Sequence, residues 1–322
     1  MLRRLLRRLP TLTPRQYELV TLTALVLLFA IVLSGAAVRL TGSGLGCEHW
    51  PRCGETVVAP LETHAMIEFG NRVVTGIVGI PCLVAFFASF RRTPRRRDLT
   101  LLSALLPLSV LGQAILGGLT VIFELRPGFV MGHFLLSMLI LAAAVALYWR
   151  ARHEPDARPT HDRRTVLATR ALIPFGGLAL FAGTLATAAG PHPGSAGTGE
   201  VVGRLDWIAL DAMIHWHGRT GTLLGLAAVF AWYTARKHGA DRPLMRALTV
   251  LCLLVASQGI IGFAQYTLDL PAGLVWIHIV VASAAWVALL FAVAAAGRLV
   301  PAEASVPGSE QQQKQRWATS SS

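Results

Sequence analysis

The chain has 322 residues, of which 54% are hydrophobic and only 14% are charged. Soluble domains carry about 25% charged residues, so this composition excludes an ordinary soluble globular protein. The formal net charge of +12 is high enough for a nucleic-acid binder, but the basic residues form short clusters between long apolar runs. That placement argues against a continuous nucleic-acid-binding face and favours a membrane protein whose surroundings are the lipid bilayer.

Eight stretches are long and apolar enough to cross a bilayer as helices. A spanning helix needs about 20 mostly apolar residues, because every backbone polar group must be satisfied within the segment. The first stretch follows a basic start but is too long for the hydrophobic region of a cleaved signal peptide, so we predict that it is retained. The predicted helices cover residues 18–38, 65–89, 99–122, 128–149, 168–189, 209–235, 244–266 and 272–297.

Lys and Arg residues gather at one end of these helices. Most of the 29 basic residues lie at the N-terminus, in residues 91–97, 150–170 and 236–246, and in the C-terminal tail. Cytoplasmic loops of membrane proteins carry an excess of Lys and Arg. We therefore predict a multi-pass protein of the cell membrane with both termini in the cytoplasm.

The two halves of the chain resemble each other. Gln113–Gly117 matches Gln258–Gly262, and in each half the Gln precedes an isolated histidine, His133 or His278, at the same spacing. Four helices per half is an even number, so both copies keep one orientation and the repeat is parallel. The predicted fold is an all-α integral membrane protein with eight transmembrane helices, arranged as two tandem four-helix bundles in a parallel pseudo-repeat.

This reading divides the chain into five segments. Residues 1–17 form a cytoplasmic N-terminal segment, and residues 18–149 form the first four-helix half. Residues 150–167 are a cytoplasmic linker, and residues 168–297 form the second half. Residues 298–322, which contain Pro, Ser and a run of Gln, are predicted to be a disordered cytoplasmic tail.

Five of the ten histidines lie in predicted helices or at their outer ends. One intramembrane histidine is as readily a hydrogen-bonding residue as a ligand, but ionisable groups at this depth usually mark functional sites. His133 and His278 are equivalent in the repeat, and His215 and His217 lie at a depth similar to that of His278. Two imidazoles at matched depth on facing helices suit the axial positions of a haem. The fifth histidine is His64.

Glu68 and two arginines are the other polar candidates. Arg72 lies one helical turn after Glu68, where opposite charges form an ion pair, so a structural role is open. The other role for Glu68 is a proton acceptor or a substrate-positioning group beside a bound ligand. Arg72 and Arg219 either extend toward the membrane surface or pair with haem propionates.

The four cysteines fall into two classes. Cys47 and Cys53 share a loop predicted to lie outside the cell, where a disulfide persists. Cys82 and Cys252 are single residues in apolar helices and are expected to act as small buried hydrophobes.

The chain resembles haem A synthase, an enzyme family that oxidises a ring methyl of haem O to the formyl group of haem A. The resemblance implies a membrane haem-dependent oxidoreductase with haem b and iron as cofactors and haem O as substrate. It also implies partnership with the farnesyltransferase that makes haem O and with cytochrome oxidase assembly, and it leaves a homo-oligomer open. It rests on Gly42–Cys47, Trp50–Cys53, Ile67–Arg72, Gly132–Phe134 and Trp276–His278, and it covers residues 18–297.

The resemblance assigns roles to individual residues. It makes His133 a ligand of the substrate haem in the first half and His278 a ligand of haem b in the second. Glu68 matches the catalytic glutamate of the family, and Cys47 and Cys53 match its outer-loop cysteine pair. The runner-up function is a non-catalytic di-haem cytochrome that relays electrons, which has no need of a carboxylate beside one haem only.

Two ligand positions depart from the family pattern. In the second predicted helix Asn71 stands where the family has histidine, so either His64, two turns earlier, replaces that ligand or His133 holds the substrate iron alone. In the sixth, Gly218 takes the histidine position. His215 lies on the same face as Gly218, so we favour it as the haem b ligand, with His217 as the competitor.

Overall fold

The computed structural model describes residues 10–47, 49–157, 159–195, 204–205 and 207–299. These residues are almost entirely helical, which confirms the predicted all-α fold. The helices are α2 (Pro14–Leu40), α3 (Thr63–Ser89), α4 (Arg97–Ile122), α5 (Pro127–Arg152), α6 (Arg163–Arg170), α7 (Leu172–Ala189), α8 (Leu210–Lys237), α9 (Arg242–Thr267) and α10 (Ala272–Ala296), with a 3-10 turn η1 (Pro155–Ala157) and a short parallel pair of strands, β1 (Thr160–His161) and β2 (Arg298–Leu299).

Seven helical segments in the described part of the chain are long and apolar enough to cross a membrane. They are α2, α3, α4, α5, the continuous α6–α7 segment, α9 and α10, so the protein is a multi-pass membrane protein. The remaining predicted span, residues 209–235, corresponds to α8, which is 28 residues long. This helix is outside the set of seven, and its first half carries His215, His217 and Arg219.

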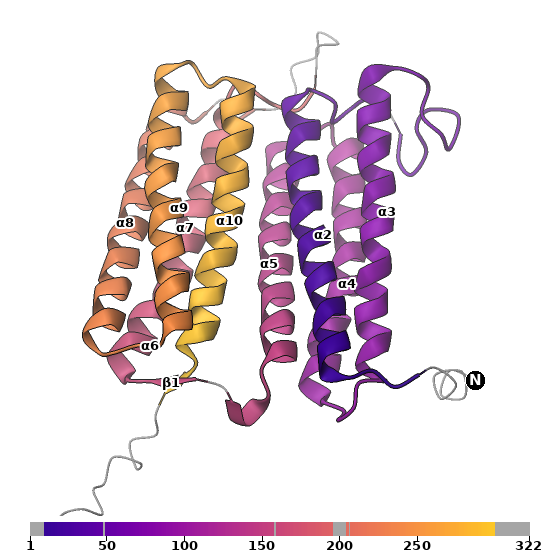
Figure 1. The fold of residues 1–322 in the computed structure, drawn as a ribbon. Coiled ribbons are helices and arrows are strands. Elements are labelled where there is room, and N and C mark those ends of the chain that lie inside the picture. Colours follow the sequence, from indigo (N-terminus) through magenta and orange to yellow (C-terminus); the bar gives the residue numbers. More distant parts are fainter. Residues whose placement is uncertain (1–9, 48, 158, 196–203, 206, 300–322) are drawn as a thin grey trace, which may run out of the picture.

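The long helices form two groups that lie side by side (Figure 1). Helices α2–α5 make one bundle and α7–α10 make the other, with α10 in contact with both α2 and α5. Two tryptophans of α10 bond across this boundary. The indole nitrogen of Trp286 donates to the Met138 carbonyl oxygen at 2.9 Å, and that of Trp276 donates to the Leu33 carbonyl oxygen at 3.1 Å.

Small residues fill the contacts between helices. Ala24, Ala85, Ala231 and Ala292 are fully buried, which lets neighbouring backbones approach closely, as membrane helices do. The outward faces are apolar instead: Leu101 and Ile260, for example, are 72% and 73% exposed. Exposed apolar side chains along a spanning helix are what a lipid environment covers.

The helix ends follow local capping residues rather than the limits of the apolar runs. Helix α2 begins at Pro14, earlier than predicted, because Thr13 and Gln16 form a capping box that satisfies free N–H groups of the first turn. The Asp241 side chain accepts from the Leu244 N–H at 3.0 Å and starts α9. Helix α10 ends at Ala296, and the next residue, Gly297, has a positive φ of 70°, which glycine adopts readily.

The segment predicted as a linker is folded. Residues 150–167 contain the end of α5, the η1 turn, strand β1 and the start of α6. Strand β1 pairs with Arg298 and Leu299, the first two residues of the segment predicted to be a disordered tail. The rest of that tail and residues 1–9 lie outside the described residues.

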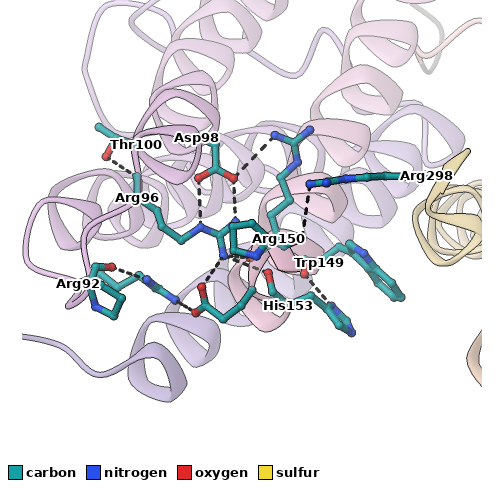
Figure 2. Close-up of polar contacts among 11 residues, drawn as sticks. Arg92, Arg96, Asp98, Thr100, Trp149, Arg150, His153 and Arg298 are labelled. Atoms are coloured by element: carbon teal, nitrogen blue, oxygen red, sulfur yellow. Dashed lines mark hydrogen bonds and ion pairs between the residues drawn. The ribbon is translucent and has the colours of Figure 1, made fainter. Parts of the chain in front are cut away.

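At the basic end of the first bundle, buried arginines join the α3–α4 connection to the end of α5 (Figure 2). Arg96 donates to both carboxylate oxygens of Asp98, at 3.2 and 2.8 Å, and to the Arg150 carbonyl oxygen at 2.8 Å. The guanidinium of Arg92 is fully buried and pairs with Glu154. We call the end of the molecule with these residues the basic end.

At the opposite end, connections from the two bundles interlock. Arg39 at the end of α2 donates to the carbonyl oxygens of Thr187 and His192, at 3.1 and 3.0 Å. The His192 ring in turn donates to the Leu270 carbonyl oxygen at 2.8 Å, because a carbonyl only accepts. The connections of the second bundle at this end are thus fastened to the first bundle.

Candidate functional site

Two histidines face each other inside the second bundle. The rings of His217 in α8 and His278 in α10 have centroids 5.9 Å apart. Nδ1 of His217 bonds to the Ala179 carbonyl oxygen of α7 at 3.1 Å. Since that oxygen only accepts, Nδ1 carries the hydrogen and Nε2 keeps its free lone pair. Metal-binding histidines are oriented by the same kind of bond.

Glycines make room for both rings. A Cβ atom added to Gly183 of α7 would lie 3.0 Å from Cε1 of His217, and one added to Gly262 of α9 would lie 3.5 Å from Cε1 of His278. Gln258 donates to the His278 carbonyl oxygen at 2.8 Å. Nδ1 of His278 is buried without a hydrogen-bond partner among the described residues. Each imidazole therefore lies directly against a neighbouring helix backbone.

His133 of the first bundle has the same surroundings as His278. Gln113 donates to the His133 carbonyl oxygen at 3.1 Å, and a Cβ atom on Gly117 would lie 3.2 Å from Cε1 of the His133 ring. Its Nδ1 is likewise buried and without a partner in the described part of the chain. Unlike His278, it makes no ring contact with another histidine among the aromatic pairs of these residues.

His64 and Asn71 are engaged elsewhere. His64, exposed at the first turn of α3, bonds through Nδ1 to the Ser43 hydroxyl at 2.9 Å. The Asn71 amide oxygen accepts from the Ser34 hydroxyl of α2 at 2.7 Å. Neither side chain has a bond to α5, the helix that carries His133, among the described contacts.

Glu68 and Arg72 hold the disulfide loop. Glu68 is buried, and its two oxygens accept from the Cys47 backbone N–H at 2.8 Å and from Arg72 at 2.5 Å. Arg72 also donates to the carbonyl oxygens of His49 and Arg52, both at 3.2 Å. The predicted disulfide between Cys47 and Cys53 is present. The ion pair is therefore an anchor for a covalently closed loop.

The same loop reaches α4 beside His133. A Cβ atom on Gly118 would lie 2.7 Å from the Trp50 ring, so the indole packs on this glycine. Gly117, the preceding residue, accommodates the His133 ring. The loop held by Glu68 thus covers the part of the first bundle in which His133 lies. Sequence reasoning used Gly117 only as a mark of the repeat and missed the packing role of both glycines, although glycine within an apolar helix often has a packing reason.

The structure places His217, and not His215, toward the interior of the second bundle. The His215 side chain is 59% exposed and lies 3.4 Å from Asp211, whose carboxylate also accepts from the Tyr266 hydroxyl at 2.9 Å. Two residues along a helix are rotated by about 200°, so only one of the two histidines faces the bundle interior. The side of α8 that faces α7, and whose ring lies beside that of His278, is the side of His217.

Arg219 is exposed and has no carboxylate partner within the described residues. It therefore differs from Arg72, its counterpart in the repeat, whose guanidinium is occupied by Glu68 and the loop carbonyls. A free guanidinium near the mouth of the second bundle is available to a carboxylate from a bound ligand.

The two facing imidazoles fit an iron that is held mainly by a macrocycle. An imidazole nitrogen lies about 2 Å from a bound metal ion, and ring centroids 5.9 Å apart leave room for one ion between the rings. No group of three or more His, Cys, Asp or Glu side chains suited to a metal ion exists in the described part of the chain. Two axial histidines, with the other ligands supplied by the cofactor, match this donor set.

Comparison with known proteins also finds relatives that are named for haem chemistry. The chain matches the family model COX15-CtaA, described as cytochrome oxidase assembly protein, over residues 18–190. A heme A synthase of Lysinibacillus sphaericus is 34% identical over 126 residues, which are 38% of this chain and 41% of that protein. A heme A synthase of Alkalihalophilus pseudofirmus is 32% identical over 119 residues, 36% of this chain and 40% of that protein.

A longer match extends over both bundles. A protoheme IX farnesyltransferase of Thermus thermophilus is 27% identical over 289 residues, which are 81% of this chain but 45% of that protein. The chain thus spans less than half the length of each of these three relatives. The family model covers Glu68 and His133 but ends before His217 and His278.

Proposed function

Because this chain belongs to the COX15-CtaA family of cytochrome oxidase assembly proteins, we propose that it is a haem A synthase, a membrane oxidoreductase that oxidises a ring methyl of haem O to a formyl group. The observation that carries the proposal is the facing pair His217 and His278, whose rings are 5.9 Å apart inside an apolar bundle. The heme A synthases among its relatives support the assignment.

Eight membrane spans in two parallel repeats are part of this proposal. Gln113–His133 and Gln258–His278 make the same side-chain-to-carbonyl bond. The α4–α5 and α9–α10 connections also match, since Leu125 and Leu270 both have positive φ, 56° and 59°. Helix α8 is then the remaining span, with His217 facing the bundle interior. The clustering of arginines at one end supports cytoplasmic termini.

The second bundle would hold haem b. His217 and His278 are its axial ligands in this proposal, with the Ala179 carbonyl oxygen fixing the tautomer of His217. Arg219 is free to pair with a propionate. A haem with two histidine ligands takes up and passes on single electrons, which suits a relay rather than the oxidation itself.

The first bundle would hold the substrate haem. We propose His133 as the only protein ligand of its iron, because the Asn71 amide bonds to Ser34 and His64 is exposed at the first turn of α3, with no bond to α5 among the described contacts. A metal with an open coordination position is the usual arrangement of a reactive site. The loop closed by Cys47 and Cys53, with Trp50 on Gly118, would limit water access to this iron.

Glu68 would accept a proton released during the oxidation. Its two hydrogen bonds come from donors, the Cys47 N–H and the Arg72 guanidinium, and such donors stabilise the charged carboxylate that a base requires. The same bonds give Glu68 a structural duty in holding the loop. The catalytic role is therefore a proposal that needs a separate test.

The chemistry of the substrate and of the product implies a preceding and a following step. An enzyme that attaches the farnesyl chain must supply haem O, and the similarity to a protoheme IX farnesyltransferase supports a link with that step. The family description supports delivery of the product to cytochrome oxidase assembly.

The deciding experiment is a chromatogram of haems extracted from cells that make haem O but have no other source of haem A. Expression of this chain should produce haem A. Bound haem b with haem O unchanged would reject the synthase and favour the di-haem electron relay. A chain purified without any haem would reject both.

A further inference from the structure

A pocket of about 530 Å³ lies between the end of α8 and the start of α9, at the basic end of the second bundle. It lies at the C-terminal end of α8, whereas His217 lies in the first half of that helix. Its walls combine arginines with apolar and aromatic residues, chiefly Trp232, Arg236, Arg242, Arg246, Thr249 and Val250.

The pocket is rich in unpaired positive charge. Arg236, Arg242 and Arg246 are exposed, and none of them has a carboxylate partner among the described residues. The guanidinium of Arg236 lies over the Trp232 ring, 5.5 Å from its centroid. The nearest acidic residue in sequence, Asp241, caps α9 and lies 3.6 Å from the His161 ring.

The first bundle shows the contrast at the same end of the molecule. Its arginines Arg92 and Arg96 are buried and neutralised by Glu154 and Asp98 (Figure 2). Charges that fold the protein are paired in this way. Three arginines that share one pocket without carboxylates can instead bind an anion that is not part of the chain.

The walls of the pocket also select the kind of anion. Trp232 is fixed by an indole bond to the Thr249 hydroxyl at 3.0 Å, and tryptophan is typical of the headgroup level of a membrane. Exposed apolar side chains continue along the same two helices toward the membrane centre: Phe230 is 62% and Leu253 is 66% exposed. A ligand that touches both regions needs an anionic head and a hydrocarbon tail.

We propose that this pocket binds the phosphate headgroup of an anionic membrane phospholipid. Arg242 and Arg246 hold the phosphate, since guanidinium groups match phosphate oxygens in a bidentate geometry. Arg236 and Trp232 close the side of the pocket, and the acyl chains lie along the apolar faces of α8 and α9. Basic pockets between membrane helices bind lipid headgroups in this manner.

The test compares lipid retention by purified full-length protein. The chain is reconstituted in nanodiscs of equal parts phosphatidylglycerol and phosphatidylcholine, released, and examined by native mass spectrometry. Phosphatidylglycerol should be retained in preference to phosphatidylcholine, and Arg242→Gln with Arg246→Gln should weaken that retention by about 5-fold for each arginine. The matched control, Arg163→Gln with Arg164→Gln, removes two exposed charges of α6 outside the pocket and should retain the lipid as the wild type does.

Three outcomes would overturn the proposal. Equal retention by the wild type and the pocket variant means that the arginines do not bind the lipid. Equal loss in the α6 control means that only the net charge matters. Displacement of phosphatidylglycerol by an equal concentration of inorganic phosphate means that the pocket is a free-anion site. If the double variant is not recovered folded, the single variants Arg242→Gln and Arg246→Gln decide, and no loss in either contradicts the proposal.

Discussion

The rings of His217 and His278 face each other across the second bundle with centroids 5.9 Å apart, and the carbonyl oxygen of Ala179 holds the first of them in place. Helices α8 and α10, which α9 separates in the chain, thereby bring their histidine rings into contact.

The first prediction separates the two neighbouring histidines of α8. His217→Ala should abolish the low-spin haem b absorbance of the purified protein, as should His278→Ala, because each removes one of two axial ligands. His215→Ala should leave that spectrum intact, since the His215 ring is exposed and lies beside Asp211. Loss of the signal in His215→Ala but not in His217→Ala would contradict the orientation of α8.

The second prediction concerns the glycines that accommodate the imidazoles. Gly183→Ala places a methyl group 3.0 Å from the His217 ring, and overpacking of this kind costs about 1–3 kcal/mol. The ring should tilt, so the haem b spectrum shifts or weakens. Gly177→Ala, on the same helix with open space around the new Cβ, is the control and should bind haem b normally. Identical absorbance spectra for both variants would count against the close packing of His217.

The third prediction tests Glu68. Glu68→Gln keeps the size of the side chain and an acceptor for the Cys47 N–H, but it removes the charge and the capacity to take a proton. If the role is chemical, haem A formation per folded molecule should fall by about 10²–10⁴-fold, with haem O accumulating and the haem b spectrum unchanged.

Arg72→Gln provides the comparison for this variant. It breaks the same ion pair and the bonds to the loop carbonyls while leaving the carboxylate present. A larger loss of activity in Glu68→Gln than in Arg72→Gln supports a proton acceptor. Equal losses, accompanied by equal losses of thermal stability, would reduce Glu68 to an anchor of the loop.

The fourth prediction concerns the disulfide loop. Cys47→Ser with Cys53→Ser should lower the free energy of unfolding by about 2 kcal/mol, because the closed loop is short and its cysteines are six residues apart. The melting temperature in detergent should fall, and a reducing agent should lower that of the wild type but not that of the variant. An unchanged wild-type melting curve after reduction, verified by alkylation of both thiols, would show that Glu68 and Arg72 hold the loop without the bond.

The sequence predicted the helices well because the apolar runs are long and uninterrupted. Their bounds depended on single residues such as Thr13 and Asp241, whose side chains extend the helices beyond the apolar residues. The strand pair of Thr160 and His161 with Arg298 and Leu299 was missed, since two-residue strands that are distant in sequence leave no periodic signal.

The candidate site was predictable in part. The equivalence of His133 and His278 could be read from the spacing to Gln113 and Gln258, and in the structure each histidine carbonyl accepts a hydrogen bond from its Gln side chain. The choice between His215 and His217 could not be read in this way. It depends on which face of α8 packs against α7, and both faces of that turn carry a histidine.

The two indole bonds of α10 have a consequence for electron transfer. Trp286 and Trp276 donate to carbonyl oxygens of α5 and α2, within segments suited to span the membrane, where little water competes for these groups. The distance between the two candidate haem positions is then fixed by the fold and does not change through a domain motion. Electrons passing from the second bundle to the first would cross a gap of fixed width, so changes of redox potential rather than of distance would govern their rate.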